Sequence, residues 1–184
     1  MLWAVVAPAQ SIDIYFSPNG GAATAVAKEI TAAKTSIRVI AYSIGKGQIT
    51  AALIAAQARG IDVRLIVDPH QVNQTYSTAG KIKKAGVPTL VDQAHALQHN
   101  KVIIIDNTVT ITGSMNFTTP GDKTNAENVL IIRDTTIAAR YTANWIVHQN
   151  HSQTFTQEKS IDTKRKTPPP ELVLPQKDAH AQEP

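Results

Sequence analysis

The sequence predicts an α/β domain in which a mixed β-sheet carries helices on both of its faces. Short apolar runs of strand length alternate with alanine-rich segments of helix length along most of the chain. In the second half of the chain, two such runs follow each other directly, as the strands of an antiparallel hairpin do. With 184 residues, of which 42% are hydrophobic, the chain is long and apolar enough for one domain with a buried core.

The individual elements follow from hydrophobic periodicity and from the residues that end each segment. The predicted strands cover residues 12–17, 36–43, 61–68, 89–91, 101–106, 109–112 and 128–133. The predicted helices cover residues 22–34, 48–59, 80–85 and 135–149. Gly60 and Gly86 end the second and third helices, and residues 107–108 form the expected tip of the hairpin. On the last helix, Tyr141 and Trp145 are expected in the core or at a dimer contact.

Composition and charge exclude several classes of protein. The chain has no cysteine, which excludes disulfides, thiol catalysis and cysteine-ligated zinc. No apolar run approaches the roughly 18 residues needed to cross a bilayer, so stable insertion in a membrane is not expected. Residues 1–155 carry 13 basic and 9 acidic side chains, whereas residues 156–184 carry five of each. The positive charge therefore belongs to the folded part and is compatible with a polyanionic partner.

The two ends of the chain differ in character from residues 11–151, which we assign to the single folded domain. Residues 1–10 are apolar, and Ala7–Ala9 within them resembles the small-residue cleavage site of a signal peptide. We interpret this segment as the remnant of such a peptide and expect a periplasmic or secreted protein, with an ordinary chain terminus as the alternative. Residues 152–184 are expected to form a disordered tail, because residues 168–184 hold five of the ten prolines without any periodicity.

One stretch of the sequence carries the residues of a candidate catalytic site. It reads H-x-K-x4-D-x6-G-S-x-N, and the residues at its fixed positions are His99, Lys101, Asp106, Gly113, Ser114 and Asn116. This pattern resembles the signature of the phospholipase D superfamily, and its surroundings resemble the small bacterial endonuclease branch, which has one motif per subunit. The further matches are Tyr15–Pro18, Ala41–Ser43 and Asn125–Asn128, whereas Ile44–Gly47 departs from that branch. The resemblance implies the phospholipase D/nuclease fold and phosphodiester chemistry.

The spacing of the motif residues also has a physical interpretation. His99 and Lys101 are two residues apart at the start of a strand, so their side chains leave the same face. Ser114 and Asn116 share one face at the end of the partner strand for the same reason. Asp106 has the opposite parity to Lys101, so we expect it to brace the structure rather than to carry a proton. The motif glycine is expected to support the site as well.

This set of groups suits the hydrolysis of a phosphodiester. Lys101, Ser114 and Asn116 can hold the negative charge of the phosphate oxygens while an imidazole attacks phosphorus and forms a covalent phosphohistidine. A second imidazolium has to protonate the leaving alkoxide, and the chain has one motif. We therefore expect a homodimer whose two-fold axis passes through the active site, with His99 supplied by each subunit. No metal ion and no cofactor are expected, because the lysine and the imidazolium provide the positive charge.

A few residues outside the motif are expected to assist it. Glu127 is expected to orient His99, because a carboxylate on one ring nitrogen fixes the tautomer and leaves the other nitrogen to react. The resemblance implies the same role, and the alternative is a solvated glutamate at the start of a strand. Lys46, His70 and Lys123 are candidate substrate contacts.

Three further histidines receive structural interpretations. His95 is interpreted as a loop histidine. His148 and His151 have helical spacing, but the sequence offers no third ligand beside them. A frayed, polar helix end is therefore expected there rather than a metal site.

The favoured function is a metal-independent, sequence-nonspecific endonuclease that cuts DNA, with RNA left open as a substrate. The first alternative is a phospholipase D that acts on phospholipid headgroups with the same residues. The alternative from another class is a nucleic-acid-binding protein that has lost catalysis. The sequence argues against this last alternative, because His99, Lys101 and Asn116 are all present.

Overall fold

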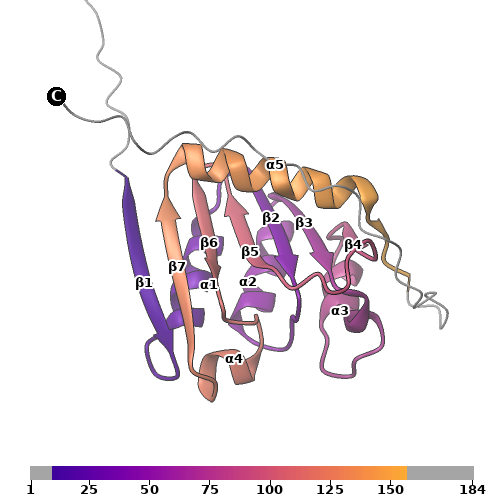
Figure 1. Cartoon of the computed structure of the whole chain (residues 1–184), viewed down its shortest axis with the longest axis horizontal. Coiled ribbons are helices and arrows are strands. Elements are labelled where there is room, and N and C mark those ends of the chain that lie inside the picture. The colour runs from indigo at the N-terminus through magenta and orange to yellow at the C-terminus, as the bar shows by residue number, and fades with distance from the viewer. Residues whose placement is uncertain (1–9, 157–184) are drawn as a thin grey trace, which may run out of the picture.

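The computed structural model describes residues 10–156, which fold around one eight-stranded β-sheet (Figure 1). The strands are β1 (Ser11–Ser17), β2 (Ser36–Ala41), β3 (Asp62–Val67), β4 (Thr89–Val91), β5 (Lys101–Ile105), β6 (Val109–Gly113), β7 (Glu127–Arg133) and β8 (Gln153–Thr154). The helices are α1 (Ala22–Ala32), α2 (Gln48–Ala58), the 3₁₀ turn η1 (Pro69–Val72), α3 (Ala79–Lys84), α4 (Thr119–Lys123) and α5 (Thr135–His151). The strand order across the sheet is β1-β7-β6-β5-β2-β3-β4-β8.

The sheet is mixed, as the sequence predicts. β2, β3 and β4 pair in parallel, and the helices α2 and α3 make the connections between them. The pairs β1–β7, β7–β6, β6–β5, β5–β2 and β4–β8 are antiparallel. The predicted strands and helices are all present, within a few residues of their expected bounds.

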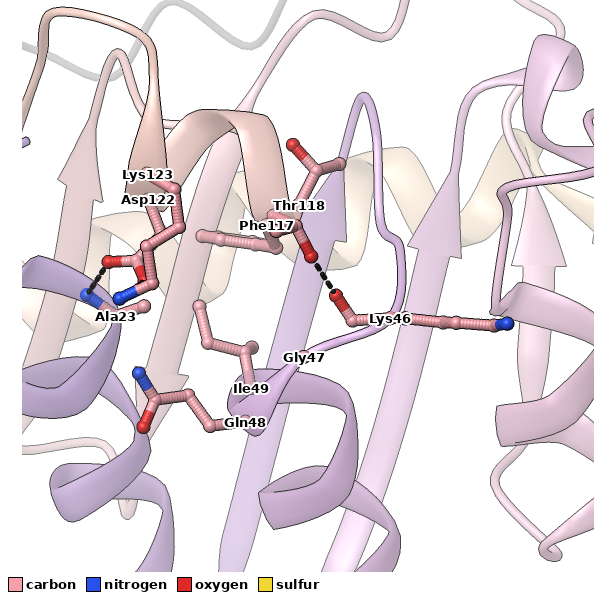
Figure 2. Close-up of a pocket in the computed structure, with 10 residues that line it drawn as sticks. Ala23, Lys46, Gly47, Gln48, Ile49, Phe117, Thr118, Asp122 and Lys123 are labelled. Atoms are coloured by element: carbon pink, nitrogen blue, oxygen red, sulfur yellow. Dashed lines mark hydrogen bonds and ion pairs between the residues drawn. The ribbon is translucent and has the colours of Figure 1, made fainter. Parts of the chain in front are cut away.

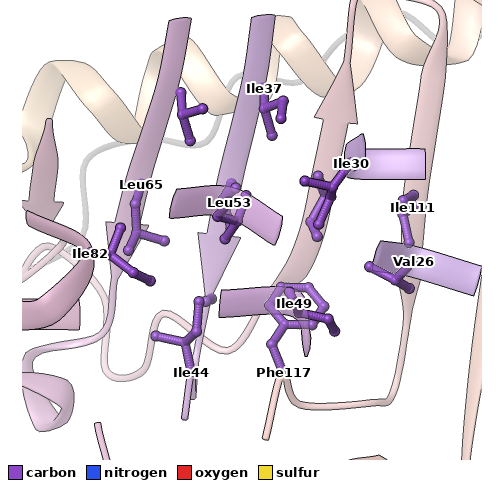
Figure 3. Close-up of a cluster of buried hydrophobic side chains, with 14 of the residues drawn as sticks. Val26, Ile30, Ile37, Ile44, Ile49, Leu53, Leu65, Ile82, Ile111 and Phe117 are labelled. Carbon is purple, nitrogen blue, oxygen red and sulfur yellow. The ribbon is translucent and has the colours of Figure 1, made fainter. Parts of the chain in front are cut away.

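Helices cover both faces of the sheet, and each face has its own apolar cluster. On one face, α1, α2 and α3 pack side chains such as Ile30, Leu53 and Ile82 against the strands (Figure 3). The helix α5 crosses the other face (Figure 1). It packs Ala138 and Trp145 against strand residues that include Ile104. A strand that is buried on both faces reads as a continuous apolar run, as β5 does.

Trp145 lies in the core of the single chain, which was one of the two places expected for it, the other being a dimer contact. Its side chain is 2% exposed, and its Nε1 atom donates a hydrogen bond of 3.2 Å to the backbone oxygen of Val39. Tyr141 is partly buried against the same cluster. Packing within the chain therefore accounts for both rings without a dimer contact.

The structure differs from the predicted elements at two places. The hairpin loop comprises residues 106–108 rather than residues 107–108 alone, and Asp106 and Asn107 in it have positive φ angles of 52° and 53°. Asp and Asn tolerate positive φ angles well, and a hydrogen bond from the N–H of Thr108 to the oxygen of Ile105 closes the turn. The ordered chain also continues beyond the predicted domain end at His151. β8 pairs with β4 there, and Phe155 is 2% exposed because it packs into the main core.

The predicted signal-peptide remnant and nearly all of the predicted tail lie outside the described residues. Within residues 10–156, no helix combines the length and the apolar character that a bilayer crossing requires.

Candidate active site

The motif residues other than Asp106 lie at one end of the sheet, where β5 and β7 begin and β6 ends. Because these three strands are antiparallel neighbours, the start of β5 meets the end of β6 and the start of β7. Lys101 is the first residue of β5, Ser114 follows β6 directly and Glu127 is the first residue of β7. The topology therefore brings both halves of the motif and the following glutamate to one edge.

His99 and Lys101 are in direct contact. Lys101 Nζ lies 3.1 Å from His99 Nδ1 and donates a hydrogen bond of 2.6 Å to the His99 backbone oxygen. The lysine is only 7% exposed, whereas the histidine is exposed. Burial lowers the pKa of Lys101, and the nearby carboxylate of Glu127 offsets part of this effect. The ammonium group is thus held beside the imidazole with little freedom to move.

Tyr42 is a site residue that the motif does not contain. Its ring centroid lies 4.4 Å from that of His99, and Lys101 Nζ lies 4.9 Å from the same Tyr42 ring, a distance typical of a cation–π contact. Tyr42 follows β2 directly, and Lys101 pairs with the last residue of that strand, Ala41. The sequence signal that could have identified Tyr42 is an aromatic residue at the carboxyl end of a predicted parallel strand. Ligands of open α/β sheets bind at these strand ends.

Ser114 and Glu127 form a second pair. Ser114 Oγ donates to Glu127 Oε2 at 2.5 Å, and the backbone N–H of Asn128 donates to Ser114 Oγ at 3.0 Å. Glu127 Oε1 accepts from Asn125 Nδ2 at 3.1 Å. Among the described residues, no hydrogen bond joins Glu127 to His99, so the expected orienting pair is not formed within the chain. The reason is that Ser114, at the end of the adjacent strand, donates its hydroxyl hydrogen bond to the Glu127 carboxylate.

Gly113 allows β6 to approach β7 closely beside this pair. Its φ angle is 150°, and a Cβ atom at this position would lie 2.2 Å from the backbone oxygen of Asn128. No side chain fits at that distance, so the motif requires glycine here. The backbone N–H of the next residue, Ser114, donates to the same Asn128 oxygen at 3.1 Å.

Asn116 lies just beyond this close approach. Its Oδ1 atom is buried and has no hydrogen-bond partner among the described residues. Its backbone oxygen accepts from the N–H of Thr118 at 2.8 Å, which folds the chain into a turn before α4. The backbone of Asn116 is thus fixed while part of its amide has no protein partner within residues 10–156.

The carboxylate of Asp106 is engaged at the opposite end of β5 from Lys101. It accepts hydrogen bonds from the backbone N–H groups of Lys34, Thr35 and Ser36 at 2.8, 2.8 and 2.9 Å, and from Thr35 Oγ1 at 2.8 Å. Burial alone would raise the pKa of Asp106, but these four donors hold it below its usual value. The carboxylate therefore joins the hairpin tip to the segment that enters β2.

Lys46 and Lys123 line a common pocket of about 180 Å³ next to the segment that follows Asn116 (Figure 2). In Figure 2 the Lys46 side chain extends away from the pocket, and Lys123 lies on the other side with Asp122. Lys123 Nζ is 2.9 Å from Asp122 Oδ2, so part of its charge is neutralised. Lys46 also lines a neighbouring cavity of about 530 Å³ with Ser43, the residue after Tyr42.

His70 lies in η1, after the carboxyl end of β3. Its Nδ1 atom is 2.6 Å from Asp68 Oδ1, and the ring is half exposed. The other carboxylate oxygen of Asp68 accepts from the backbone N–H of Gln98 at 2.8 Å. Since Gln98 immediately precedes His99, this buried aspartate connects the His70 loop to the start of the motif.

The histidines of α5 are not on a frayed end, which corrects the expectation for them. His148 is 7% exposed, and its Nδ1 atom lies 2.8 Å from Oδ2 of the fully buried Asp92. His151 Nε2 is 3.1 Å from the same oxygen, and His95 Nδ1 is 3.2 Å from it. The sequence could not reveal this cluster, because its members come from a loop and from a helix more than fifty positions later.

The chain is similar to a known family and to several named proteins. The family described as "Cardiolipin synthase, PLD-like domain" matches residues 26–146. A phospholipase D of Rickettsia bellii is 42% identical over 131 residues, which cover 71% of this chain and 65% of that protein. This chain thus spans less than two thirds of that relative's length. A mitochondrial cardiolipin hydrolase of Xenopus tropicalis is 30% identical over 131 residues, covering 69% of this chain and 62% of the hydrolase.

Solved structures with the same fold include Nuc from Salmonella typhimurium, described as a phospholipase D family member. It superimposes with a TM-score of 0.76 at 35% sequence identity, and the match covers 80% of this chain and 99% of Nuc. NucT from Helicobacter pylori gives a TM-score of 0.75 at 21% identity, covering 80% of this chain and 100% of NucT. The predicted fold class is confirmed by these superpositions.

Proposed function

This chain belongs to the phospholipase D-like family, and we propose that it is a phosphodiesterase that cuts nucleic acid as a metal-independent, sequence-nonspecific endonuclease. The observation that carries the proposal is the meeting of two side-chain pairs, His99 with Lys101 and Ser114 with Glu127, at one end of the sheet. This arrangement offers an exposed imidazole beside a cation and a hydroxyl, as the hydrolysis of a phosphodiester needs.

In the proposed reaction, a ring nitrogen of His99 attacks phosphorus and displaces the alkoxide, which leaves a covalent phosphohistidine. Lys101 holds the negative charge of the non-bridging oxygens, assisted by the amide of Asn116 and by the Ser114 hydroxyl once it turns from Glu127 to the phosphate. A second imidazolium gives its proton to the leaving alkoxide, and then, as a base, takes a proton from the water that hydrolyses the phosphohistidine. The histidine and the enzyme return to their starting state.

The second imidazolium is proposed to come from a second copy of the chain. Ile12, Ile14 and Phe16 lie at alternate positions on the edge strand β1 and are 57%, 58% and 62% exposed. Such a continuous apolar stripe is typical of an interface. Phe16 pairs with Asn128, the neighbour of Glu127, so the stripe runs toward the candidate site. A copy seated on this stripe would adjoin β7, which begins at Glu127, with β6 and β5 next in the sheet.

A lipid phosphodiester is the second candidate substrate, because the Rickettsia bellii relative is named phospholipase D and the Xenopus tropicalis relative cardiolipin hydrolase. The chemistry at phosphorus would be the same for both substrates. The net charge of +4, together with Lys46, which lines both cavities, favours nucleic acid as the substrate instead.

We also propose that the protein is exported from the cytoplasm. N-terminal sequencing of protein from its native host tests this proposal.

The deciding experiment compares plasmid nicking and choline release from phosphatidylcholine vesicles, both in excess EDTA. His99→Asn is the inactive variant, and His180→Asn is the matched control, since it changes a histidine outside the described residues. Nicking by the wild type and the control, but not by His99→Asn, is the expected result. Choline release without nicking would establish the lipid substrate, and DNA binding without cleavage would identify an inactive binding protein.

The dimer has a separate test. Ile14→Asp places a charge in the middle of the exposed stripe and is expected to give a monomer in sedimentation or light-scattering measurements, with an unchanged circular dichroism spectrum. Because one active site then lacks its second imidazole, nicking should fall by about 100-fold or more. A monomeric wild type with full activity would contradict the shared site.

A further inference from the structure

A compact group of metal-ligand side chains lies apart from the candidate active site. Asp92 and His95 come from the loop after β4, and His148 and His151 come from the last turns of α5. One ligand atom from each of the four residues lies within 4.8 Å of the ligand atoms of the other three. Neither the proposed reaction nor the fold of the sheet requires three imidazoles at this place.

The carboxylate of Asp92 is the centre of the group. Asp92 Oδ2 lies 2.8 Å from His148 Nδ1, 3.1 Å from His151 Nε2 and 3.2 Å from His95 Nδ1. Bonds of the length that zinc makes to nitrogen and oxygen place tetrahedral ligands about 3.3 Å apart. The contacts from the carboxylate to the imidazoles are close to this spacing, and all four ligand atoms lie within 4.8 Å of one another.

Two observations indicate that hydrogen bonds alone do not account for the group. His151 Nε2 is buried and makes no hydrogen bond among the described residues, although it lies 3.1 Å from Asp92 Oδ2. The rings of His95, His148 and His151 have centroids only 5.0 to 5.4 Å apart. A single dication can engage three neutral imidazoles that lie this close together.

Neighbouring polar groups hydrogen-bond to the carboxylate of Asp92. Gln98 Nε2 donates to Asp92 Oδ2 at 2.6 Å and lies 2.8 Å from His148 Nδ1, so this amide contacts two of the ligand atoms and has to withdraw when an ion binds. The backbone N–H of Ala94 donates to Asp92 Oδ1 at 3.0 Å. Such outer hydrogen bonds orient the first ligands and are a regular part of metal centres. Asp92 and His148 are buried, while His95 and His151 are 20% and 17% exposed, which leaves a path for an ion.

We propose that Asp92, His95, His148 and His151 bind one transition-metal dication of the zinc class in a closed, tetrahedral, structural site. Three nitrogen ligands and one oxygen ligand suit Zn²⁺, and four protein ligands leave no position for a substrate. The ion joins the loop after β4 to α5, and this loop leads through Gln98 to the motif. Its role is to stabilise the packing of this loop against α5, so the proposal is independent of the proposed function.

The test uses the untagged full-length chain, stripped with EDTA and then dialysed free of it. Titration with ZnCl₂ in a calorimeter is expected to give one site per chain, and Co²⁺ is expected to give the visible absorption bands of tetrahedral coordination. Added Zn²⁺ should raise the melting temperature of the wild type, because the ion binds the folded state.

Two variants decide which residues bind the ion. His95→Gln and His151→Gln change the partly exposed ligands, which spares the buried part of the cluster, and each should weaken Zn²⁺ binding by about tenfold or more. His70→Gln is the matched control, since it removes a histidine that is also paired with a buried aspartate, and it should leave binding unchanged. Absence of stoichiometric Zn²⁺ binding, or unchanged binding in both ligand variants, would overturn the proposal. Loss of binding in the control would also do so, because it would place the ion at Asp68.

Discussion

Replacing Asp106 by alanine should destabilise the protein without removing a reacting group. Its carboxylate accepts four hydrogen bonds, from the N–H groups of Lys34, Thr35 and Ser36 and from the Thr35 hydroxyl, at 2.8 to 2.9 Å. A hydrogen bond to a charged group contributes about 1.5–3 kcal/mol when it is well shielded. Three of these four bonds are solvent-exposed, so water replaces much of what the substitution removes.

The net effect can be worked out from these contacts. We expect a loss of about 2–3 kcal/mol from the hydrogen bonds and about 1 kcal/mol from placing alanine at a φ angle of 52°. The free energy of unfolding of such domains is about 5–15 kcal/mol, so the Asp106→Ala protein should still fold. Asp106→Asn is the matched control, because asparagine keeps one acceptor oxygen and tolerates the positive φ, and it should lose about half as much.

The assay is urea unfolding at pH 7 and at pH 3, together with plasmid nicking by the folded variants. Because the pKa of Asp106 is lowered in the folded state, its stabilisation is present above the unfolded value of about 4 and is lost as the pH falls through the lowered pKa. The difference between the wild type and Asp106→Asn should therefore shrink in acid. An alanine variant as stable as the wild type would refute the bracing argument. A stable variant that fails to cut DNA, as His99→Asn should, would place Asp106 in the reaction.

Three further predictions concern the packing and the charges of the site. Gly113→Ala should lower the free energy of unfolding in urea by about 2–4 kcal/mol, because the new Cβ atom would lie 2.2 Å from the Asn128 backbone oxygen. Stability equal to the wild type would mean that β6 and β7 separate easily at this point. Since burial lowers the pKa of Lys101, nicking activity should begin to decline with rising pH below pH 10.5, and Lys101→Arg should remove this decline even at a lower rate. A decline that persists in the arginine variant would belong to another group. Trp145→Ala should cost about 3–5 kcal/mol by opening a cavity between α5 and the sheet, whereas Trp145→Phe should cost less, and equal losses in both would point to the Val39 hydrogen bond instead.

Much of the fold follows from local patterns in the sequence. The run KVIII predicts a strand buried on both faces, and β5 is buried at all five of its positions. The prediction missed α4 and β8, because five and two residues are too few for a periodic signal. It took residues 107–108 as the hairpin tip, whereas the loop also includes Asp106, since Asp106 and Asn107 both adopt positive φ and Thr108 closes the turn with Ile105.

The candidate site was only partly visible before the structure. The motif spacing predicted that His99 and Lys101 share one face, and their side chains are indeed in contact. The partner of Glu127 could not be predicted in this way, because the choice between a histidine and the Ser114 hydroxyl depends on which strand ends lie closer in the sheet. Tyr42 was missed as a site residue for the same reason, since its place beside His99 follows from the pairing of β2 with β5.

The sequence by itself determined which groups this protein carries and which strands present them, because periodicity and motif spacing act over a few residues. Tertiary structure alone decided which groups meet. It turned Glu127 toward Ser114 and left Ile12, Ile14 and Phe16 exposed on an edge strand. It also gathered three imidazoles around Asp92. Contacts between residues far apart in the chain depend on the order of the strands and on the packing of the helices, and no local pattern encodes these.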